Sequence, residues 1–313
     1  MQNNIPKISA IVVSFNCADV IFECINSLLN HENCEVILVD NNSTDETVKN
    51  LESIISKIKF IQNSINKGFT KACNQAIDVS TAEYLLLFNP DAYVKNNKTL
   101  SLLVNELDND KRLGAVSPQL LFPDGKIQNY NRRFPLISGV IVESFIPSKF
   151  WNKFSAYQKY TYQDLNLTKE NYLEQPAGAA ILFRRDFRLD ENYFIYGSDV
   201  ELCKNITDSQ LKIKTVPNSQ VFHHQSKGGT ENVNHKIKMY LQLEYYYAMH
   251  YFFKKHHSYF YASAYYLINA VFLSAIAIST ISTFNSRKIK LKFNRLIYFL
   301  QSKRMTDGGK LSS

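Results

Sequence analysis

Two short polar segments in the first third of the chain each place carboxylates directly after an apolar run. Residues 89–91, Asn-Pro-Asp, follow the apolar run 84–88, and residues 40–45, Asp-Asn-Asn-Ser-Thr-Asp, follow the apolar run 35–39. Short apolar runs of this kind are typical of buried strands, and open α/β sheets bind their ligands where the strands end. We therefore expect the two segments to lie side by side at one edge of a sheet, where they could bind a nucleotide and a metal ion.

Asp91 is the first candidate for a metal ligand. A hard divalent cation such as Mg²⁺ or Mn²⁺ prefers carboxylate and phosphate oxygens, and it stabilises the negative charge that grows on a departing diphosphate. Pro90 fixes a backbone angle in the turn that presents this carboxylate. For the three residues taken alone, a strand-ending turn without a ligand is the simpler interpretation.

Asp40 is the matching candidate for nucleotide binding. Its carboxylate could accept hydrogen bonds from a base or a ribose, and a helix predicted to start near Thr44 would present free backbone N–H groups nearby. Ser43 and Glu46 have the spacing of a capping box. A purely structural role in capping this helix is the alternative, and the two roles are compatible.

The elements that must position these residues alternate between strand and helix. Short β-branched or apolar runs predict strands at residues 8–15, 35–39, 59–62, 84–88, 115–121 and 178–184. Apolar residues at helical spacing predict helices at residues 18–30, from 44, 69–79, 99–107 and 198–208. This alternation indicates parallel strands joined by right-handed crossovers. Residues 130–172 are aromatic, basic and poorly periodic, so we expect a mobile loop region there.

Taken together, the motifs resemble those of the inverting family 2 glycosyltransferases in order and spacing over residues 8 to about 228. They are residues 12–16 (Val-Val-Ser-Phe-Asn), 39–45 (Val-Asp-Asn-Asn-Ser-Thr-Asp), 66–69 (Asn-Lys-Gly-Phe) with Asn74, 89–91, 178–179 (Gly-Ala), 190–191 (Asp-Glu), 196–203 (Tyr-Gly-Ser-Asp-Val-Glu-Leu-Cys), and 216–217 (Val-Pro) with His223. Each string is common by itself, whereas the joint order is specific. The chain looks most similar to the rhamnosyltransferase-like subgroup of bacterial surface-polysaccharide synthesis.

The resemblance implies an α/β fold of the GT-A type, with a Rossmann-like, mostly parallel central sheet flanked by helices and a C-terminal helical tail. The catalytic domain would cover residues 1–228, with nucleotide-sugar binding in about 1–120 and the acceptor side, including the expected loop region, in about 121–228. Residues 229–313 would form a helical, basic and aromatic region that associates with a membrane.

The resemblance also implies roles for individual residues. Asp199 would be the catalytic base, because the family's aspartate at this motif faces the acceptor hydroxyl from the start of a helix. The donor-binding residues would be Ser14, Asn16, Asp40, Asn42, Asn66, Gly68, Asn74, Asn89 and Asp91. The acceptor side would include Gly178, Ala179 and Ser198. The metal ligands would be Asp91 and, as a second candidate, His223, for which a purely structural histidine is an equally good interpretation.

Three features depart from the family pattern. Asn89 and Ser198 stand where the family commonly has acidic residues, and the segment 187–190 is several residues shorter than usual. These departures motivate a second hypothesis, a catalytically degenerate scaffold subunit that binds a nucleotide sugar. A nucleotide-dependent oxidoreductase is a third hypothesis, which is disfavoured because the turn after the first strand lacks Gly-x-Gly-x-x-Gly.

The C-terminal region is basic and contains a long uncharged stretch. From residue 227 onward there are 13 Lys and Arg against 3 Asp and Glu, a net charge of +10, which leaves −2 for residues 1–226. Residues 258–286 carry no charge and are bracketed by Lys and Arg. This pattern favours a helix in the plane of an anionic membrane surface, and it disfavours nucleic acid as the partner. A packing or homodimer helix and a true membrane span are the alternatives.

The remaining composition narrows the class of protein. The chain has 313 residues and 45% hydrophobic content, enough for a large core, and its five scattered cysteines predict free buried thiols. Residues 1–7 lack the pattern of a secretory signal, so we expect a cytoplasmic protein, peripheral on the inner face of the cytoplasmic membrane. The expected reaction is metal-assisted, inverting transfer of rhamnose or a related hexose from a dTDP or UDP donor to a lipid-linked or polysaccharide acceptor.

Overall fold

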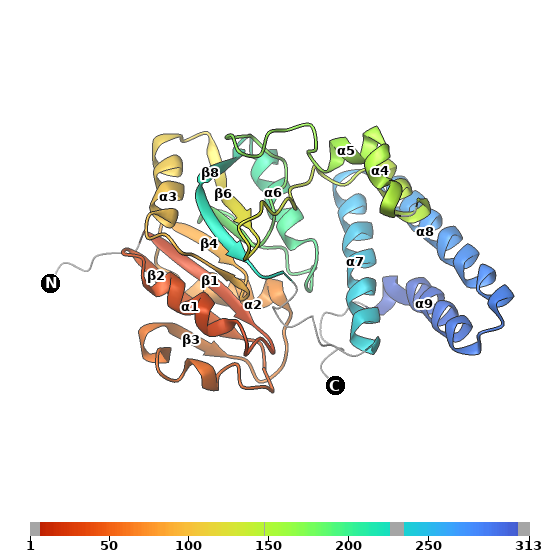
Figure 1. The fold of residues 1–313 in the computed structure, drawn as a ribbon, viewed down its shortest axis with the longest axis horizontal. Coiled ribbons are helices and arrows are strands. Elements are labelled where there is room, and N and C mark those ends of the chain that lie inside the picture. Colours follow the sequence, from red (N-terminus) through yellow and green to blue (C-terminus); the bar gives the residue numbers. More distant parts are fainter. Residues whose placement is uncertain (1–6, 147, 226–234, 306–313) are drawn as a thin grey trace.

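The computed structural model describes residues 7–146, 148–225 and 235–305. A central sheet is covered by helices, and a group of long helices lies beside it (Figure 1). The sheet has eight strands in the order β3-β2-β1-β4-β7-β6-β8-β5. The predicted mostly parallel central sheet flanked by helices is therefore confirmed, and it also contains antiparallel pairs.

The first half of the sheet consists of four parallel strands with β1 paired to both β2 and β4. These strands are β1 (Ile8–Ser14), β2 (Cys34–Asp40), β3 (Lys59–Gln62) and β4 (Tyr84–Phe88). The α-helices that connect them are α1 (Ile21–Leu29) and α2 (Phe69–Val79). The register places Ser14 opposite Asp40, so the polar ends of β1 and β2 leave the sheet at the same edge.

The second half of the sheet is mixed. Its strands are β5 (Ala92–Tyr93), β6 (Leu113–Leu121), β7 (Ala180–Arg184) and β8 (Lys212–His223), and its helices are α3 (Thr99–Asn109) and α6 (Ser198–Asp208). β7 runs antiparallel between β4 and β6, and β8 runs parallel to β6. The pairs Phe88–Ala180 and Ala92–His223 bring late segments of the chain to the end of β4.

The central strands are buried on both faces, as their near-continuous apolar runs require. Side chains of β1 alternate between two layers: Val12 packs in the layer covered by α1 and α3, whereas Ile11 packs in the layer covered by α2 and α6. All five cysteines are free, as predicted, and four of them are buried.

The helix predicted from Thr44 is wrong. The segment after β2 forms turns and two short 3₁₀ helices, η1 (Lys49–Leu51) and η2 (Ile55–Lys57). The carboxylate of Asp45 accepts a hydrogen bond from the backbone N–H of Thr47 at 3.0 Å, and the Thr47 hydroxyl donates to the same carboxylate. Local side-chain bonds of this kind compete with helix formation.

The loop region predicted over residues 130–172 is also wrong in part, because it contains helices. These are α4 (Ile137–Phe145), η3 (Ser148–Lys153) and α5 (Ser155–Tyr160). α4 contacts a C-terminal helix, where its first N–H group, on Ile137, donates to the hydroxyl of Tyr261 at 3.0 Å. Helices this short depend on tertiary contacts, which hydrophobic periodicity along one segment does not reveal.

The C-terminal region is helical, as predicted. Its elements are α7 (His235–His256), α8 (Tyr259–Ser279), η4 (Ile281–Thr283) and α9 (Ser286–Met305). Tyr193 and Val200, from the turn before α6 and from α6 itself, share one apolar core with Phe252 and Phe253 of α7. The core is thus continuous across the predicted boundary near residue 228. The roles predicted for its two sides, catalysis and membrane association, stay predictions.

The shared core predicts that α7 unfolds together with the sheet. Phe252→Ala removes a fully buried ring and should lower the free energy of unfolding by about 3–5 kcal/mol in a single cooperative urea transition. Phe260→Ala is the matched control, because this ring on α8 is 82% exposed, and its effect should stay within about 0.5 kcal/mol. Two separate transitions, with only the smaller one shifted by Phe252→Ala, would contradict the shared core.

Candidate active site

The ends of β1 and β2 are joined through the buried carboxylate of Asp40. Ser14 Oγ donates to Asp40 Oδ1 at 2.9 Å, Ser43 Oγ donates to the same oxygen at 2.6 Å, and Ser43 N–H donates to Oδ2 at 2.9 Å. Asp40 is fully buried. Its charge is therefore compensated by three donors, and it holds the two strand ends in one fixed arrangement.

Two asparagines shape the loops above this carboxylate. Asn16 and Asn42 have φ values of +51° and +68°, in the left-handed region that asparagine tolerates better than most residues. Asn16 Oδ1 accepts from the Thr44 N–H at 2.8 Å, and the Asn16 N–H donates to Ser43 Oγ at 2.9 Å. Asn42 is partly exposed at the same rim.

Asn41, which the sequence did not single out, draws the third loop to the same edge. Its Nδ2 donates to the carbonyl of Gly68 at 3.0 Å, and its Oδ1 accepts from the N–H of Lys67 at 3.1 Å. Asn66 Oδ1 in turn accepts from the Gly68 N–H at 2.9 Å. Predicted residues Asn66 and Gly68 thus lie beside the end of β2, as the donor-site hypothesis requires.

Gly68 also meets a steric requirement. Its φ is +82°, and a Cβ at this position would lie 2.4 Å from Cδ2 of Phe194. The N–H of Phe69 donates to the Phe194 carbonyl at 2.7 Å. Only glycine allows this close approach between the donor-side loop and the segment that leads into α6.

The side chain of Asn74 binds the segment before α6. Its Nδ2 donates to the carbonyl of Leu189 at 3.0 Å and to Glu191 Oε1 at 2.9 Å, and its Oδ1 accepts from the Leu189 N–H at 3.3 Å. The structure therefore shows a buried link between α2 and the segment before α6. A contact between Asn74 and the donor stays a prediction.

Asp91 and His223 face each other beyond the end of β4. Asp91 is 3% exposed, and its Oδ1 lies 3.2 Å from Nε2 of His223. Gln128 donates through Nε2 to the carbonyl of His223 at 3.3 Å, which leaves Gln128 Oε1 to accept from His223 Nδ1 at 2.7 Å. In the neutral ring this bond places the hydrogen on Nδ1, so that the Nε2 lone pair faces Asp91. Asn89 Nδ2 lies 3.4 Å from the same nitrogen.

This arrangement fits a divalent cation held jointly with a diphosphate. A carboxylate oxygen and an imidazole lone pair repel each other at this distance unless a cation or a proton lies between them. Among the described residues no group of three or more His, Cys, Asp or Glu side chains could hold a metal ion alone. Mg²⁺ is commonly bound by one or two carboxylates together with substrate phosphates. Asp91 and His223 would hold the ion, which when bound would neutralise charge on a leaving diphosphate.

Asp199, the predicted base, lies at the second residue of α6 directly above Gly178. A Cβ on Gly178 would be 2.5 Å from Asp199 Oδ2 and 3.1 Å from its Cγ, so glycine is required for this approach. The neighbouring Ala179 carbonyl accepts the N–H of Asn89 at 2.9 Å. The structure thus brings the predicted acceptor-side residues to the end of β4 that carries Asp91. Ser198, the remaining predicted acceptor-side residue, is buried at the start of the same helix.

The surroundings of Asp199 favour a proton acceptor. Burial raises the pKa of Asp199 above its ordinary value of 3.8, and hydrogen bonds from the Val200 N–H, from its own N–H and from the side chain of Gln175 offset only part of this effect. A carboxylate with a raised pKa is a stronger base as long as the pH keeps it ionised. Gln175, like Gln128, has no motif in the sequence that would have identified it.

Comparison with known proteins decides the family. Residues 9–188 match the family model described as Glycosyl transferase family 2, which is more than half of the chain. The chain belongs to this glycosyltransferase family. The predicted family is thus confirmed, and the oxidoreductase hypothesis is excluded.

Curated relatives of this glycosyltransferase include a bacterial O-antigen biosynthesis protein and a bacterial L-rhamnosyltransferase. It is 29% identical to the O-antigen biosynthesis protein RfbC of Myxococcus xanthus over 71% of this chain, although the match spans only 17% of that relative. It is 24% identical to an N-acetylglucosaminyl-diphospho-decaprenol L-rhamnosyltransferase of Mycobacterium tuberculosis, over 64% of this chain and 69% of the relative.

Solved glycosyltransferase structures share the fold. The mannosyltransferase PcManGT from Pyrobaculum calidifontis, solved with GDP-Man and Mn²⁺, aligns with a TM-score of 0.53 and 17% identity over 96% of this chain and 88% of that one. TarS of S. aureus aligns with a TM-score of 0.52 and 17% identity over 95% of this chain and 49% of that one. The predicted GT-A type fold is therefore confirmed.

The environment of Asp199 predicts a pH dependence. Only the ionised carboxylate accepts a proton, so the acidic limb of kcat/KM should lie above pH 3.8, and activity should fall as the pH falls through the raised pKa. Gln175→Leu removes a bond that favours the ionised form and should move this limb to higher pH. Asp199→Asn should abolish transfer. Measurable turnover by Asp199→Asn with an unchanged acidic limb would exclude Asp199 as the base.

Proposed function

We propose that this glycosyltransferase moves rhamnose or a related hexose from a dTDP or UDP donor to a lipid-linked or polysaccharide acceptor, with inversion at the transferred carbon. The observation that carries the proposal is the meeting of two groups at the end of β4. Asp91 with His223 lies beyond the end of the strand, and Asp199 lies over Gly178, just before the neighbouring β7. The similarity to an N-acetylglucosaminyl-diphospho-decaprenol L-rhamnosyltransferase supports the choice of a lipid-linked acceptor.

In this proposal the loops after β1, β2 and β3 bind the nucleotide. Asp40 is already engaged by Ser14 and Ser43, so it would act mainly by fixing the loops that carry Asn16, Asn42 and Asn66. The partly exposed side chains of these asparagines supply both donors and acceptors for a base or a ribose.

The proposed reaction needs a base opposite the leaving group. The acceptor oxygen forms a bond to the sugar carbon while its proton moves to Asp199, and the bond to the diphosphate oxygen breaks with its electron pair on that oxygen. Asn89 adds no charge at the end of β4, so Asp91 and His223 would hold Mg²⁺ or Mn²⁺ with help from donor phosphates. Attack and departure on opposite faces of the sugar invert the configuration.

Binding of a donor should be visible as thermal stabilisation of the purified chain. One sugar nucleotide of a dTDP, UDP and GDP panel should raise the Tm with Mn²⁺ or Mg²⁺ present, because a ligand that binds only the folded state stabilises it. Asp91→Ala should lose the metal-dependent part of the shift. Asp186→Ala, an exposed acidic residue just past the far end of β7, is the control and should retain it. An equal shift in Asp91→Ala would contradict the metal assignment, and tight binding without any transfer would favour the scaffold hypothesis.

We further propose that α8 lies in the plane of the inner face of the cytoplasmic membrane. α8 is long and apolar enough to cross a membrane by length and composition, which is weak evidence by itself. Its exposed apolar residues share one face, at spacings of seven, four and seven: Phe260, Leu267, Val271 and Ile278. Its buried residues share the opposite face: Ala262, Tyr265, Asn269, Leu273 and Ala277. A helix with one face in protein and one apolar face outward suits an interface better than a span.

Charge around α8 supports an anionic lipid surface as the partner. Phe284, between η4 and α9, is 93% exposed, and the exposed cations Arg287, Lys288 and Lys290 follow it in the first turn and a half of α9. An apolar stripe beside Lys and Arg is typical of helices that bind anionic bilayers.

Flotation with lipid vesicles would test this surface. The chain should bind vesicles of phosphatidylcholine with phosphatidylglycerol better than phosphatidylcholine alone, and Leu267→Ser/Ile278→Ser should weaken binding at least about tenfold. Val79→Ser/Ile127→Ser removes two exposed apolar side chains elsewhere and should bind normally. Absence of vesicle binding, together with a dimer in sedimentation velocity that the α8 variant dissociates, would replace the membrane with a homodimer.

A further inference from the structure

The first turn of α6 carries two carboxylates that face different partners. Asp199 lies over Gly178 at the active site. Glu201 follows two residues later, about 200° around the helix, and faces α7. Its side chain is completely buried. A buried carboxylate needs close donors or cations, and α7 supplies them.

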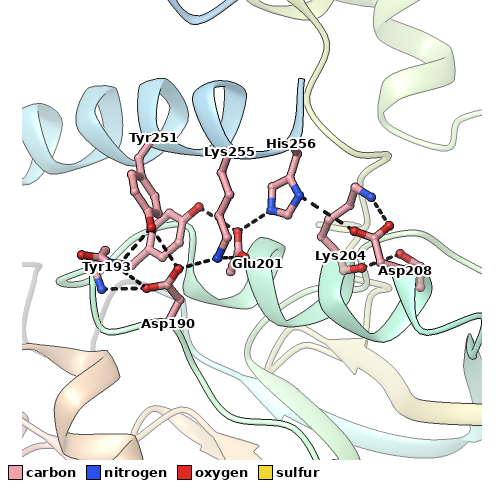
Figure 2. A network of polar contacts seen from close by, with 10 residues as sticks. Asp190, Tyr193, Glu201, Lys204, Asp208, Tyr251, Lys255 and His256 are labelled. Atoms are coloured by element: carbon pink, nitrogen blue, oxygen red, sulfur yellow. Dashed lines mark hydrogen bonds and ion pairs between the residues drawn. The ribbon is translucent and has the colours of Figure 1, made fainter. Parts of the chain in front are cut away.

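Three groups surround the Glu201 carboxylate (Figure 2). The Tyr193 hydroxyl donates to Oε2 at 3.0 Å, and His256 Nε2 lies 2.8 Å from the same oxygen. Lys255 Nζ lies 2.7 Å from Oε1. Lys255 and His256 belong to the last turn of α7, so this turn contacts the first turn of α6 through Glu201.

The last two turns of α7 also bind the segment that leads into α6. Lys255 Nζ lies 2.7 Å from Asp190 Oδ2, and the hydroxyl of Tyr251 donates to this oxygen at 3.2 Å. Farther along α6, Asp208 lies 3.9 Å from His256 Nδ1 and pairs with Lys204 (Figure 2). The contacts therefore extend along α6 from the segment before it to its last residue.

Packing removes the remaining freedom at the start of α6. Gly197 has a φ of +84°, and a Cβ there would lie 2.8 Å from the Tyr193 ring and 3.1 Å from Cβ of Ala248 on α7. The Gly197 carbonyl accepts the N–H of Glu201 at 2.9 Å. The backbone before Asp199 thus packs closely against α7. Asp199 itself packs closely against Gly178 on the opposite side.

We propose that the last turn of α7 positions the catalytic base, with Glu201, Lys255 and His256 as the positioning residues that hold Asp199 against Gly178. This inference rests on the proposed role of Asp199. Its physical basis is that displacement of a reacting group by about 1 Å can lower a rate about 100-fold. The helix dipoles support the same arrangement, because carboxylates are favourable in the first turn of α6 and cations in the last turn of α7.

Amide hydrogen exchange and steady-state kinetics of the full chain would test the proposal. In Lys255→Met, exchange of the segment 197–203 should become about tenfold faster or more, while exchange in β1 stays unchanged. With the donor found by thermal shift, kcat should fall about 10- to 100-fold and the donor KM should change less than about twofold. Lys255→Arg retains the cation and should recover most of kcat. Lys254→Met, at the exposed neighbouring position, is the control and should behave as the unmodified chain.

A double variant separates positioning from folding. Glu201→Gln/Lys255→Met removes both the fully buried carboxylate and its cationic partner and leaves only the ion pair with Asp190 broken, so most of the Tm lost in Lys255→Met should return. If the last turn of α7 positions Asp199, kcat of the double variant should stay low although its Tm recovers. Recovery of kcat together with the Tm would overturn the proposal. Unchanged exchange of segment 197–203 in Lys255→Met would overturn it as well. This exchange measurement needs no substrate, so it stays decisive even if turnover by Asp199→Asn shows that the proposed base is wrong.

Discussion

The antiparallel pairing of β4 with β7 is the contact on which the active site depends. β4 belongs to the first, parallel half of the sheet and ends in Asn89 and Asp91, whereas β7 comes about ninety residues later and begins just after Gly178. The hydrogen bond from the Asn89 N–H to the Ala179 carbonyl extends this pairing past the strand end. The groups proposed for the metal, the donor and the base therefore share one rigid edge, although they are distant in sequence.

Much of this edge could be predicted because it depends on local patterns. The apolar runs before Asp40 and Asp91 predict buried parallel strands whose carboxyl ends are polar. The observed bounds of α2, β4 and α6 agree with the ranges predicted from the sequence. The helix expected after Thr44 does not form, because the carboxylates of Asp40 and Asp45 accept hydrogen bonds from nearby backbone N–H groups in a turn conformation. The helices in segment 130–172 were not predicted because they depend on tertiary contacts: α4 packs against α8, and η3 and α5 pack against α4.

The least predictable residues are those whose partners come from another part of the chain. Gln128 orients His223 from ninety-five positions away, and Asn74 binds the segment before α6 from a helix assigned to the donor half. Glu201 lies inside a predicted motif, yet only the fold shows that its partners are on α7. Single amide side chains and buried carboxylates form no periodic pattern or motif in the sequence. Their roles depend on tertiary contacts, which cannot be predicted from the neighbouring residues.

The docking of α7 on α6 also sets the limits of a minimal catalytic fragment. A chain cut near residue 228, where the motifs end, would expose Tyr193 and Val200 to water and leave the Glu201 carboxylate without Lys255 and His256. Such a fragment would keep every motif of its family and still lose the support of its proposed base. A fragment that ends after α7 would keep these polar contacts and lack the apolar stripe of α8, but it would expose the residues of α7 that pack against Ala262, Tyr265, Leu273 and Phe299.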